Sequence, residues 1–265
     1  MKEQALTRIL QEKKQAGQQI FVPYMMAGDG GIGALHGRIE FLAAAGADAV
    51  EIGIPFSDPS ADGEVIQQAG ERALSAGTTL RKVLDCLAER SHDIPLIVMT
   101  YLNPIIAMGI PHFLGECRRA GVLGLIVPDL PHEERSLLTV EMTGSGIALI
   151  PLVSLMSSPE RVAMIAEEAE GFIYAVTVNG ITGERNSFGS GLGDHLAKLK
   201  EASEIPVLAG FGISNPAQVE KFQKLADGVI VGSAVVEAFR TGDLDIIREL
   251  AGAGRRRLPQ YETFS

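Results

Sequence analysis

The sequence predicts a single (β/α)8 barrel, the TIM-barrel architecture, in which eight parallel strands alternate with helices over residues 1–265. The chain contains eight short apolar runs, each almost continuously hydrophobic, as is typical of parallel strands covered on both faces. The intervals between them carry helical patterns, and 265 residues suit one barrel of roughly 250. The runs are residues 20–26, 49–52, 95–101, 124–128, 147–152, 171–176, 206–209 and 228–232.

Two features depart from a plain alternation of strands and helices. Residues 2–16 precede the first strand, have apolar side chains at helical spacing and are expected to cap the bottom of the barrel. The interval after the second strand is longer than the others. It predicts an inserted loop followed by helices over residues 64–76 and 80–88. We find no linker signal, so the sequence predicts one domain.

Two of the later helices carry clear start signals. Ser158 precedes Pro159, and Asn215 precedes Pro216, so each pair places a capping side chain before a proline at the first helical position. A glutamine at position 218 strengthens the second signal. These signals predict helices rather than long loops between the strands.

Composition and charge restrict the function classes. The chain has 46% hydrophobic residues and a net charge of −10, and its one tight basic cluster is residues 255–257. This acidic balance argues against a nucleic-acid surface. No apolar run approaches the roughly 18 residues of a membrane span, and the N-terminus lacks the apolar core of a signal peptide. We therefore expect a soluble, cytoplasmic protein without a membrane partner.

Cysteine and histidine spacing predicts neither a disulfide framework nor a metal site. Cys86 and Cys117 lie in separate helical segments without CxxC spacing or a neighbouring histidine. We interpret both as small buried side chains. Four histidines lack metal-ligand spacing and are expected on the surface: His36, His92, His112 and His195.

A carboxylate interrupts the second apolar run, and another follows in the next loop. Glu51 lies inside the run, where an unpaired charge costs several kcal/mol. Asp62 follows in a loop rich in Pro, Gly and Ser. Because catalytic groups of such barrels lie where the strands end, these two carboxylates are candidates for divided acid and base roles. Alternatively, Glu51 pairs with a Lys or Arg and Asp62 caps the next helix; Asp58 is interpreted as a turn residue.

Glycine-containing turns follow the last three predicted strands, over residues 179–183, 210–214 and 232–234. Glycines let the backbone approach an anion closely, and helix N-termini favour negative charge. One such turn alone is usually only turn chemistry. The correlated pair after strands seven and eight is stronger evidence, because barrels often build a phosphate site there. Ser233 would add a hydroxyl to this site.

Other polar side chains also follow the strands. Tyr24, Tyr101 and Tyr174 lie at or near strand ends, where they would suit an aromatic substrate or serve as barrel packing. Asp129 and His132 follow the fourth strand. Asp129 could contact substrate or cap the helix that begins nearby, and His132 is interpreted as a cap residue.

Specific motifs occur in a fixed order along about residues 18–240. They are FVPYMMAGD from residue 21, GADAVEIGIPFSDPSADG from 46, MTYLNP from 99, GLIVPDLP from 124, NGITG from 179, GFGIS from 210 and GSA from 232. Chance agreement in this order is implausible. With these motifs the chain resembles the α subunits of tryptophan synthase.

The resemblance implies retro-aldol cleavage of indole-3-glycerol phosphate to indole and glyceraldehyde 3-phosphate, without a metal or organic cofactor. It implies that Glu51 protonates indole C3 and takes the proton of the glycerol hydroxyl, and that Asp62 holds the indole N–H. This fits a buried carboxylate with a raised pKa beside a loop carboxylate that stays ionised.

The resemblance also assigns binding residues. The loop of residues 178–193 would close over the substrate. The phosphate would rest on Gly183, Gly212, Gly232 and Ser233. The substrate cavity would be lined by Tyr24, Tyr101, Asp129, Tyr174 and Thr182.

A pyridoxal-phosphate β subunit is the partner that the resemblance implies, within an α2β2 complex through which indole passes. Its contacts would lie in residues 55–60, bounded by Pro55 and Ser60, and at Asn103 and Pro104. Alternatives are a stand-alone lyase that releases free indole, a catalytically silent regulatory subunit, and another sugar-phosphate barrel such as an isomerase. Retention of both carboxylates argues against the silent subunit, and the PFSDP segment argues against an isomerase.

The sequence departs from the usual family pattern in the loops after the first two strands. Met26 stands where Thr is common, Gly30 where Pro is usual, Ser60 where Leu is common, and Glu64-Val65 where Pro-Thr is usual. None of these changes removes a candidate catalytic group. They bear on loop rigidity and partner contact rather than on the type of reaction.

Overall fold

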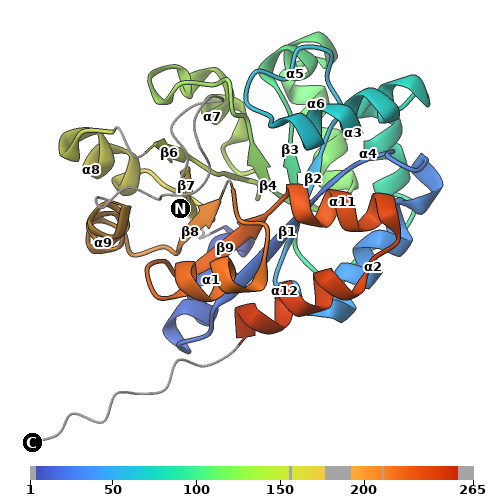
Figure 1. The fold of residues 1–265 in the computed structure, drawn as a ribbon. Coiled ribbons are helices and arrows are strands. Elements are labelled where there is room, and N and C mark those ends of the chain that lie inside the picture. The colour runs from blue at the N-terminus through green and yellow to red at the C-terminus, as the bar shows by residue number, and fades with distance from the viewer. Residues whose placement is uncertain (1–3, 155–156, 177–191, 211, 256–265) are drawn as a thin grey trace, which may run out of the picture.

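The strands curl into a barrel that is surrounded by helices (Figure 1). The structure is a computed structural model that describes residues 4–154, 157–176, 192–210 and 212–255. All strand pairs are parallel, in the order β5-β4-β3-β2-β1-β9-β8-β7-β6. The strands are β1 (Ile20–Met26), β2 (Val50–Gly53), β3 (Leu96–Met99), β4 (Val122–Ile126), β5 (Ala148–Leu149), β6 (Leu152–Ser154), β7 (Ile173–Val176), β8 (Val207–Gly210) and β9 (Gly228–Val231).

The fifth predicted strand is interrupted, which explains why nine strands replace the eight expected. β5 pairs with β4 and β6 pairs with β7, so this one segment joins the two ends of the sheet. Around the break, Ile150 N–H donates to Leu125 O, and Pro151 O accepts the N–H of Tyr174. Proline has no N–H to donate, so the ladder is broken at residue 151. The (β/α)8 prediction is confirmed.

The helices begin near the predicted positions. The side chain of Ser158 accepts the N–H of Arg161, and that of Asn215 accepts the N–H of Gln218, which confirms both caps. The helices are α1 (Ala5–Gln15), α2 (Leu35–Ala45), α3 (Glu64–Ser75), α4 (Leu80–Leu87), α5 (Leu102–Met108), α6 (Ile110–Arg119), α7 (Ser136–Met142), α8 (Pro159–Glu167), α9 (Leu192–Ala202), α10 (Pro216–Gln223), α11 (Ser233–Thr241) and α12 (Asp245–Arg255), with 3-10 turns η1 (Ile32–Ala34) and η2 (His132–Glu134).

Alternate side chains of each strand face opposite layers. In β1, Val22, Tyr24 and Met26 belong to the apolar cluster inside the barrel, whereas Phe21 and Met25 pack between the sheet and the helices. This division follows from the two-residue period of a strand. It also places Glu51 of β2 in the interior, because Glu51 lies in register with Tyr24.

Two helices close the ends of the barrel interior. Leu6 and Leu10 of α1 are fully buried in the interior cluster, and a Cβ at Gly124 would lie 2.7 Å from Leu6 Cδ2, so α1 plugs one end as predicted. At the other end, Ala69 and Ala73 of α3 join the same cluster. Within the described residues, none of the helices has both the length and the hydrophobicity to cross a membrane.

Gly53 provides a test of this packing. A Cβ at Gly53 would lie 1.9 Å from the hydroxyl of Tyr24, so we expect Gly53→Ala to lower the free energy of unfolding by about 1–3 kcal/mol. At Gly115 in α6 a Cβ would meet nothing within 4 Å. Gly115→Ala should therefore be neutral or stabilising by up to about 1 kcal/mol. Urea unfolding measures both variants, and equal stability of the two would contradict the packing argument.

Candidate active site

Glu51 is a buried carboxyl group in the barrel interior. It is 1% exposed, and neither side-chain oxygen has a hydrogen-bond partner in the described part of the chain. Burial, followed by the charge of Asp62, raises the pKa of Glu51 to about 8. The alternative of an ion pair with Lys or Arg is not observed among the described residues. The group is therefore mainly protonated at neutral pH and can donate a proton.

Asp62 is also buried, although it lies in the loop after β2. It is 7% exposed, and the hydroxyl of Tyr101 donates a hydrogen bond to Oδ2 at 3.1 Å. Burial raises the pKa of Asp62 to about 6, and the bond from Tyr101 opposes that rise. Gly63 is the N-cap residue of α3 and no side chain caps this helix, so Asp62 does not cap it. The pKa of Asp62 thus lies below that of Glu51, so Asp62 ionises first as pH rises.

Two tyrosines share the interior with the carboxyl groups. The pKa of Tyr24 is raised well above its usual value by burial and then by Asp62 and Glu51. Burial, Glu51 and Asp62 do the same to the pKa of Tyr174. Tyr24 lies in register with Glu51, and both tyrosines belong to the interior cluster, so the barrel interior holds these rings together with Glu51. A Cβ at Gly210 would lie 2.4 Å from the ring of Tyr174, so this position must remain small.

The third tyrosine connects the carboxylate to the surface. Tyr101 is 3% exposed, and its hydroxyl accepts the N–H of Ala61 at 3.0 Å while it donates to Asp62. Its ring stacks on Phe56, with centroids 5.0 Å apart. Phe56 is partly exposed and precedes the exposed turn that contains Asp58. The carbonyl of Asp58 accepts the N–H of Ser60 at 2.9 Å, in agreement with a turn role.

Backbone groups suited to an anion lie after β8 and β9. Gly232 is the N-cap residue of α11, and the first helical bonds run from Val235 and Val236 to its carbonyl. The N–H groups of Ser233 and Ala234 precede those bonds and face the free end of the helix. Gly212 has φ of +79°, a conformation that glycine adopts without strain. Gly183 and Thr182 lie outside the described residues, as does the loop of residues 178–191.

The inserted helix α3 connects the carboxylate to this anion-binding end. It begins two residues after Asp62, and its Ile66 side chain lies 3.2 Å from where a Cβ at Gly232 would sit. A glycine at 232 thus leaves room for the helix. The site therefore combines a proton donor, Glu51, and an anionic group, Asp62, with the backbone N–H groups at the start of α11.

Comparison with known proteins shows the family of this chain. The sequence model of the family described as "Tryptophan synthase alpha chain" matches residues 10–252. The chain belongs to this family. It is 53% identical to the tryptophan synthase alpha chain of Listeria innocua over 238 residues, covering 90% of this chain and 91% of the relative. It is 49% identical to that of Oceanobacillus iheyensis, covering 92% and 94%.

Solved structures of the family have the same fold. The structure of Mycobacterium tuberculosis tryptophan synthase superimposes with a TM-score of 0.87 at 32% identity, covering 96% of this chain and 100% of that chain. Tryptophan synthase subunit alpha from Legionella pneumophila gives a TM-score of 0.84 at 31% identity, covering 94% and 98%. The resemblance expected from the sequence is confirmed.

Departures from the family pattern have local explanations in the structure. Met26 is buried inside the barrel, with Sδ 4.0 Å from the hydroxyl of Tyr24. Gly30 has φ of +85°, which the usual proline cannot adopt because its φ is fixed near −65°. Ser60 is exposed. Glu64 is the first residue of α3, where a negative charge favours the helix.

Asp129 and His132 make contacts that the sequence did not predict, and the expected substrate contact of Asp129 stays a prediction. The carboxylate of Asp129 accepts the N–H of Leu102, at 2.9 and 3.2 Å, and so caps α5 rather than the following helix. The cap prediction for His132 is wrong, because Pro131 holds the N-cap position of η2 and has no side-chain cap bond. His132 Nε2 instead lies 3.5 Å from Glu168 Oε2.

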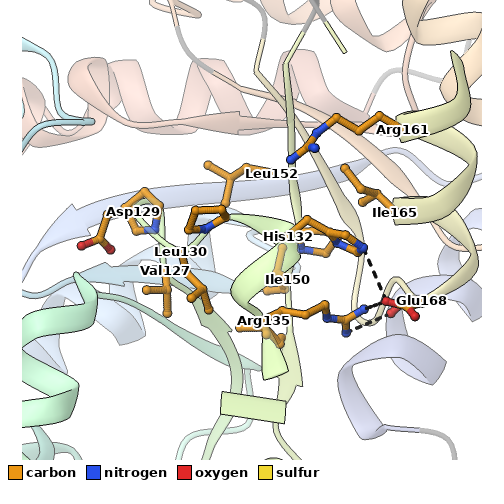
Figure 2. A pocket seen from close by; sticks show the side chains of 14 residues that line it. Val127, Asp129, Leu130, His132, Arg135, Ile150, Leu152, Arg161, Ile165 and Glu168 are labelled. Atoms are coloured by element: carbon orange, nitrogen blue, oxygen red, sulfur yellow. Dashed lines mark hydrogen bonds and ion pairs between the residues drawn. The ribbon is translucent and has the colours of Figure 1, made fainter. Parts of the chain in front are cut away.

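A hollow of about 270 Å³ is lined by the segments that follow β4 and β5 and by residues of α8. Figure 2 shows His132 and Arg135 directed toward Glu168, while Asp129 points away from them. The described residues that line this hollow include neither Glu51 nor Asp62. We therefore place the chemistry in the barrel interior and not in this hollow.

Sequence reasoning missed a buried histidine. The surface prediction is wrong for His36, which is 4% exposed and stacks on His92 with ring centroids 5.1 Å apart. Cys86 and Cys117 are free and buried, as interpreted. However, Cys86 has a histidine neighbour in space, because His36 lies 50 positions away in the sequence. No local spacing could have revealed this contact.

Proposed function

We propose that this chain cleaves indole-3-glycerol phosphate to indole and glyceraldehyde 3-phosphate, as the lyase of a tryptophan synthase. The observation that carries the proposal is the buried pair of Glu51 and Asp62, whose pKa values of about 8 and about 6 leave one group protonated and the other ionised near neutrality. Family membership supports the type of reaction.

In the proposed mechanism, Glu51 donates a proton to indole C3 while Asp62 holds the indole N–H and offsets positive charge on the ring. The Glu51 carboxylate then takes the proton of the glycerol hydroxyl. The O–H electron pair forms the aldehyde C=O bond as the carbon–carbon bond breaks, and the electron pair of that bond returns to the indole ring. Glu51 ends protonated, so the cycle consumes no proton.

The other contacts would orient the substrate. We propose that Gly212, Gly232 and Ser233 hold the phosphate through backbone N–H groups and a hydroxyl, with Gly183 from the loop after β7. Tyr24, Tyr101, Tyr174 and Thr182 would line the cavity for the indole and glycerol parts. Asp129 would act through its cap on α5, which follows Tyr101 directly.

We propose a tryptophan synthase β subunit as partner, docking on residues 55–60 and on Asn103 and Pro104. Supporting this, Asn103 is exposed, and Ile106 of the same helix presents an apolar side chain that is 56% exposed. Phe56 links this surface to Asp62 through its stacking on Tyr101. A cytoplasmic location remains a prediction.

The experiment measures indole release from indole-3-glycerol phosphate by the isolated chain, with and without a β subunit, across pH. We expect kcat/KM to be greatest between about pH 6 and about pH 8. It should fall below this window because Asp62 becomes protonated, and above it because Glu51 ionises.

The result also separates the alternatives. We expect the β subunit to increase the rate. A high rate of indole release that the β subunit does not change would favour a stand-alone lyase. Absence of indole release both with and without the β subunit would contradict the proposed function.

A further inference from the structure

A cluster of metal-ligating side chains lies outside the barrel interior, where the start of α2 meets the end of α4. His36 is the second residue of α2, Cys86 belongs to α4, and Glu89 follows that helix. His36 Nε2 lies 3.6 Å from Cys86 Sγ and 3.8 Å from Glu89 Oε2. One ligand atom from each of the three residues lies within 4.8 Å of the others. The proposed mechanism uses none of these residues.

The nitrogen-to-sulfur distance of 3.6 Å, which also allows a hydrogen bond, suits two ligands of one ion. Tetrahedral zinc, with Zn–N of about 2.0–2.1 Å and Zn–S of about 2.3 Å, places its nitrogen and sulfur ligands about 3.6 Å apart. The nitrogen-to-oxygen distance of 3.8 Å is too long for a hydrogen bond and slightly long for two zinc ligands. Glu89 is exposed and can close that difference by a small rotation.

His92 provides an independent indication of a site. Its Nε2 lies 2.9 Å from Nδ1 of His36, so one proton is shared between these two nitrogens. When His36 Nδ1 carries that proton, His36 Nε2 presents its lone pair to Cys86 and Glu89. Metal-binding histidines are held in this way, with the second ring nitrogen donating to a neighbouring acceptor. His36 is 95% buried at its side chain, so its orientation is fixed by packing.

The charges of the cluster also suit a divalent ion. A thiolate on Cys86 and the carboxylate of Glu89 would neutralise two positive charges. The nearby Arg90 is paired with Glu40 at 2.7 Å, which limits its repulsion of a cation. Burial raises the pKa of the Cys86 thiol, so metal binding must release the thiol proton to solution.

We propose that His36, Cys86 and Glu89 bind one divalent transition-metal ion of the zinc class, with His92 orienting His36 and water completing the coordination. A sulfur and an imidazole ligand favour zinc over magnesium or calcium, which prefer oxygen ligands. The ion would join α2 to α4 across the 50 residues that separate His36 from Cys86.

The test uses the full chain, stripped with a chelator and titrated with zinc sulfate against a chromophoric competitor. We expect one zinc per chain, no competition by magnesium, and a higher midpoint of thermal unfolding with zinc. Titration with cobalt chloride should give a thiolate-to-cobalt absorption band in the near ultraviolet. Absence of stoichiometric zinc binding by the wild type would overturn the proposal.

Variants assign the ligands. Cys86→Ser should lose the cobalt band, whereas Cys117→Ser, which changes the other buried cysteine, should keep it. Glu89→Gln alters an exposed side chain, so it should fold normally and bind zinc at least about 10-fold more weakly. His92→Asn should weaken binding by about 10–100-fold. If Cys86→Ser or folded Glu89→Gln bound zinc as tightly as the wild type, the ion would lie elsewhere and this site would be rejected.

Discussion

Glu51→Gln should lower kcat for indole release by a factor of about 10²–10⁴, the usual contribution of a general acid-base group. Glutamine has nearly the same shape and fits the same buried position, but it cannot supply the proton to indole C3 or accept the hydroxyl proton. Because glutamine matches the size of the buried glutamate, the variant should bind substrate with little change in KM. Steady-state kinetics at pH 7.5, with the β subunit present, measure both parameters.

Stability measurements separate loss of chemistry from loss of folding. The pKa of Glu51 is about 8 in the folded chain and about 4.5 when unfolded, so the folded state holds the extra proton between these values. The stability of the wild type should therefore fall as pH rises from about 4.5 to about 8. Glu51→Gln lacks this dependence and should gain stability relative to the wild type over the same window.

Chemical denaturation of both proteins at pH 5 and pH 8.5 tests this point. A variant that is stable at pH 8.5 yet inactive would support the acid-base role. Full activity of the folded variant would show that the proton comes from another group, and the assignment of Glu51 would be wrong.

The strands were predictable because their signal is local. An almost continuous apolar run such as residues 228–232 is typical of a buried parallel strand, and it matches β9 (Gly228–Val231) closely. Strand five was harder, since residues 147–152 read as one run although Pro151 cannot donate a ladder bond. The apolar pattern alone therefore predicts one continuous strand, whereas the proline in the same segment interrupts the backbone hydrogen bonds.

The candidate site was only partly predictable. Glu51 could be found because a charge inside an apolar run requires an explanation, and its carboxyl lies in the barrel interior. The burial of Asp62 could not be found, because it depends on α3 folding back over the barrel and on the hydroxyl of Tyr101, the residue before α5, reaching it. The cap of Asp129 on α5 and the contact of His36 with Cys86 could not be predicted either, because each contact joins residues distant in sequence.

Asp62→Asn should reduce kcat by a factor on the order of 10²–10³, because it removes a negative charge placed where positive charge develops on the indole ring. Asparagine keeps the size of the side chain and an oxygen that can accept the bond from Tyr101. The loss should therefore reflect charge rather than shape. Indole release at pH 7.5 gives the rate, and circular dichroism confirms the fold.

The same substitution should also move the alkaline limb of the pH profile. The charge of Asp62 is the second cause of the raised pKa of Glu51, after burial, so its removal should lower that pKa and shift the limb below about pH 8. An unmoved limb would mean that the two groups do not interact as the structure implies.

Tyr101→Phe is the matched control for the charge argument. It keeps the carboxylate of Asp62 but removes the hydrogen bond that lowers its pKa, so the acid limb should move above about pH 6. At pH 8 Asp62 would still be largely ionised, and the rate should fall much less than in Asp62→Asn. If Tyr101→Phe were instead as slow as Asp62→Asn at pH 8, the hydroxyl of Tyr101 and not the charge of Asp62 would be the group that the reaction requires.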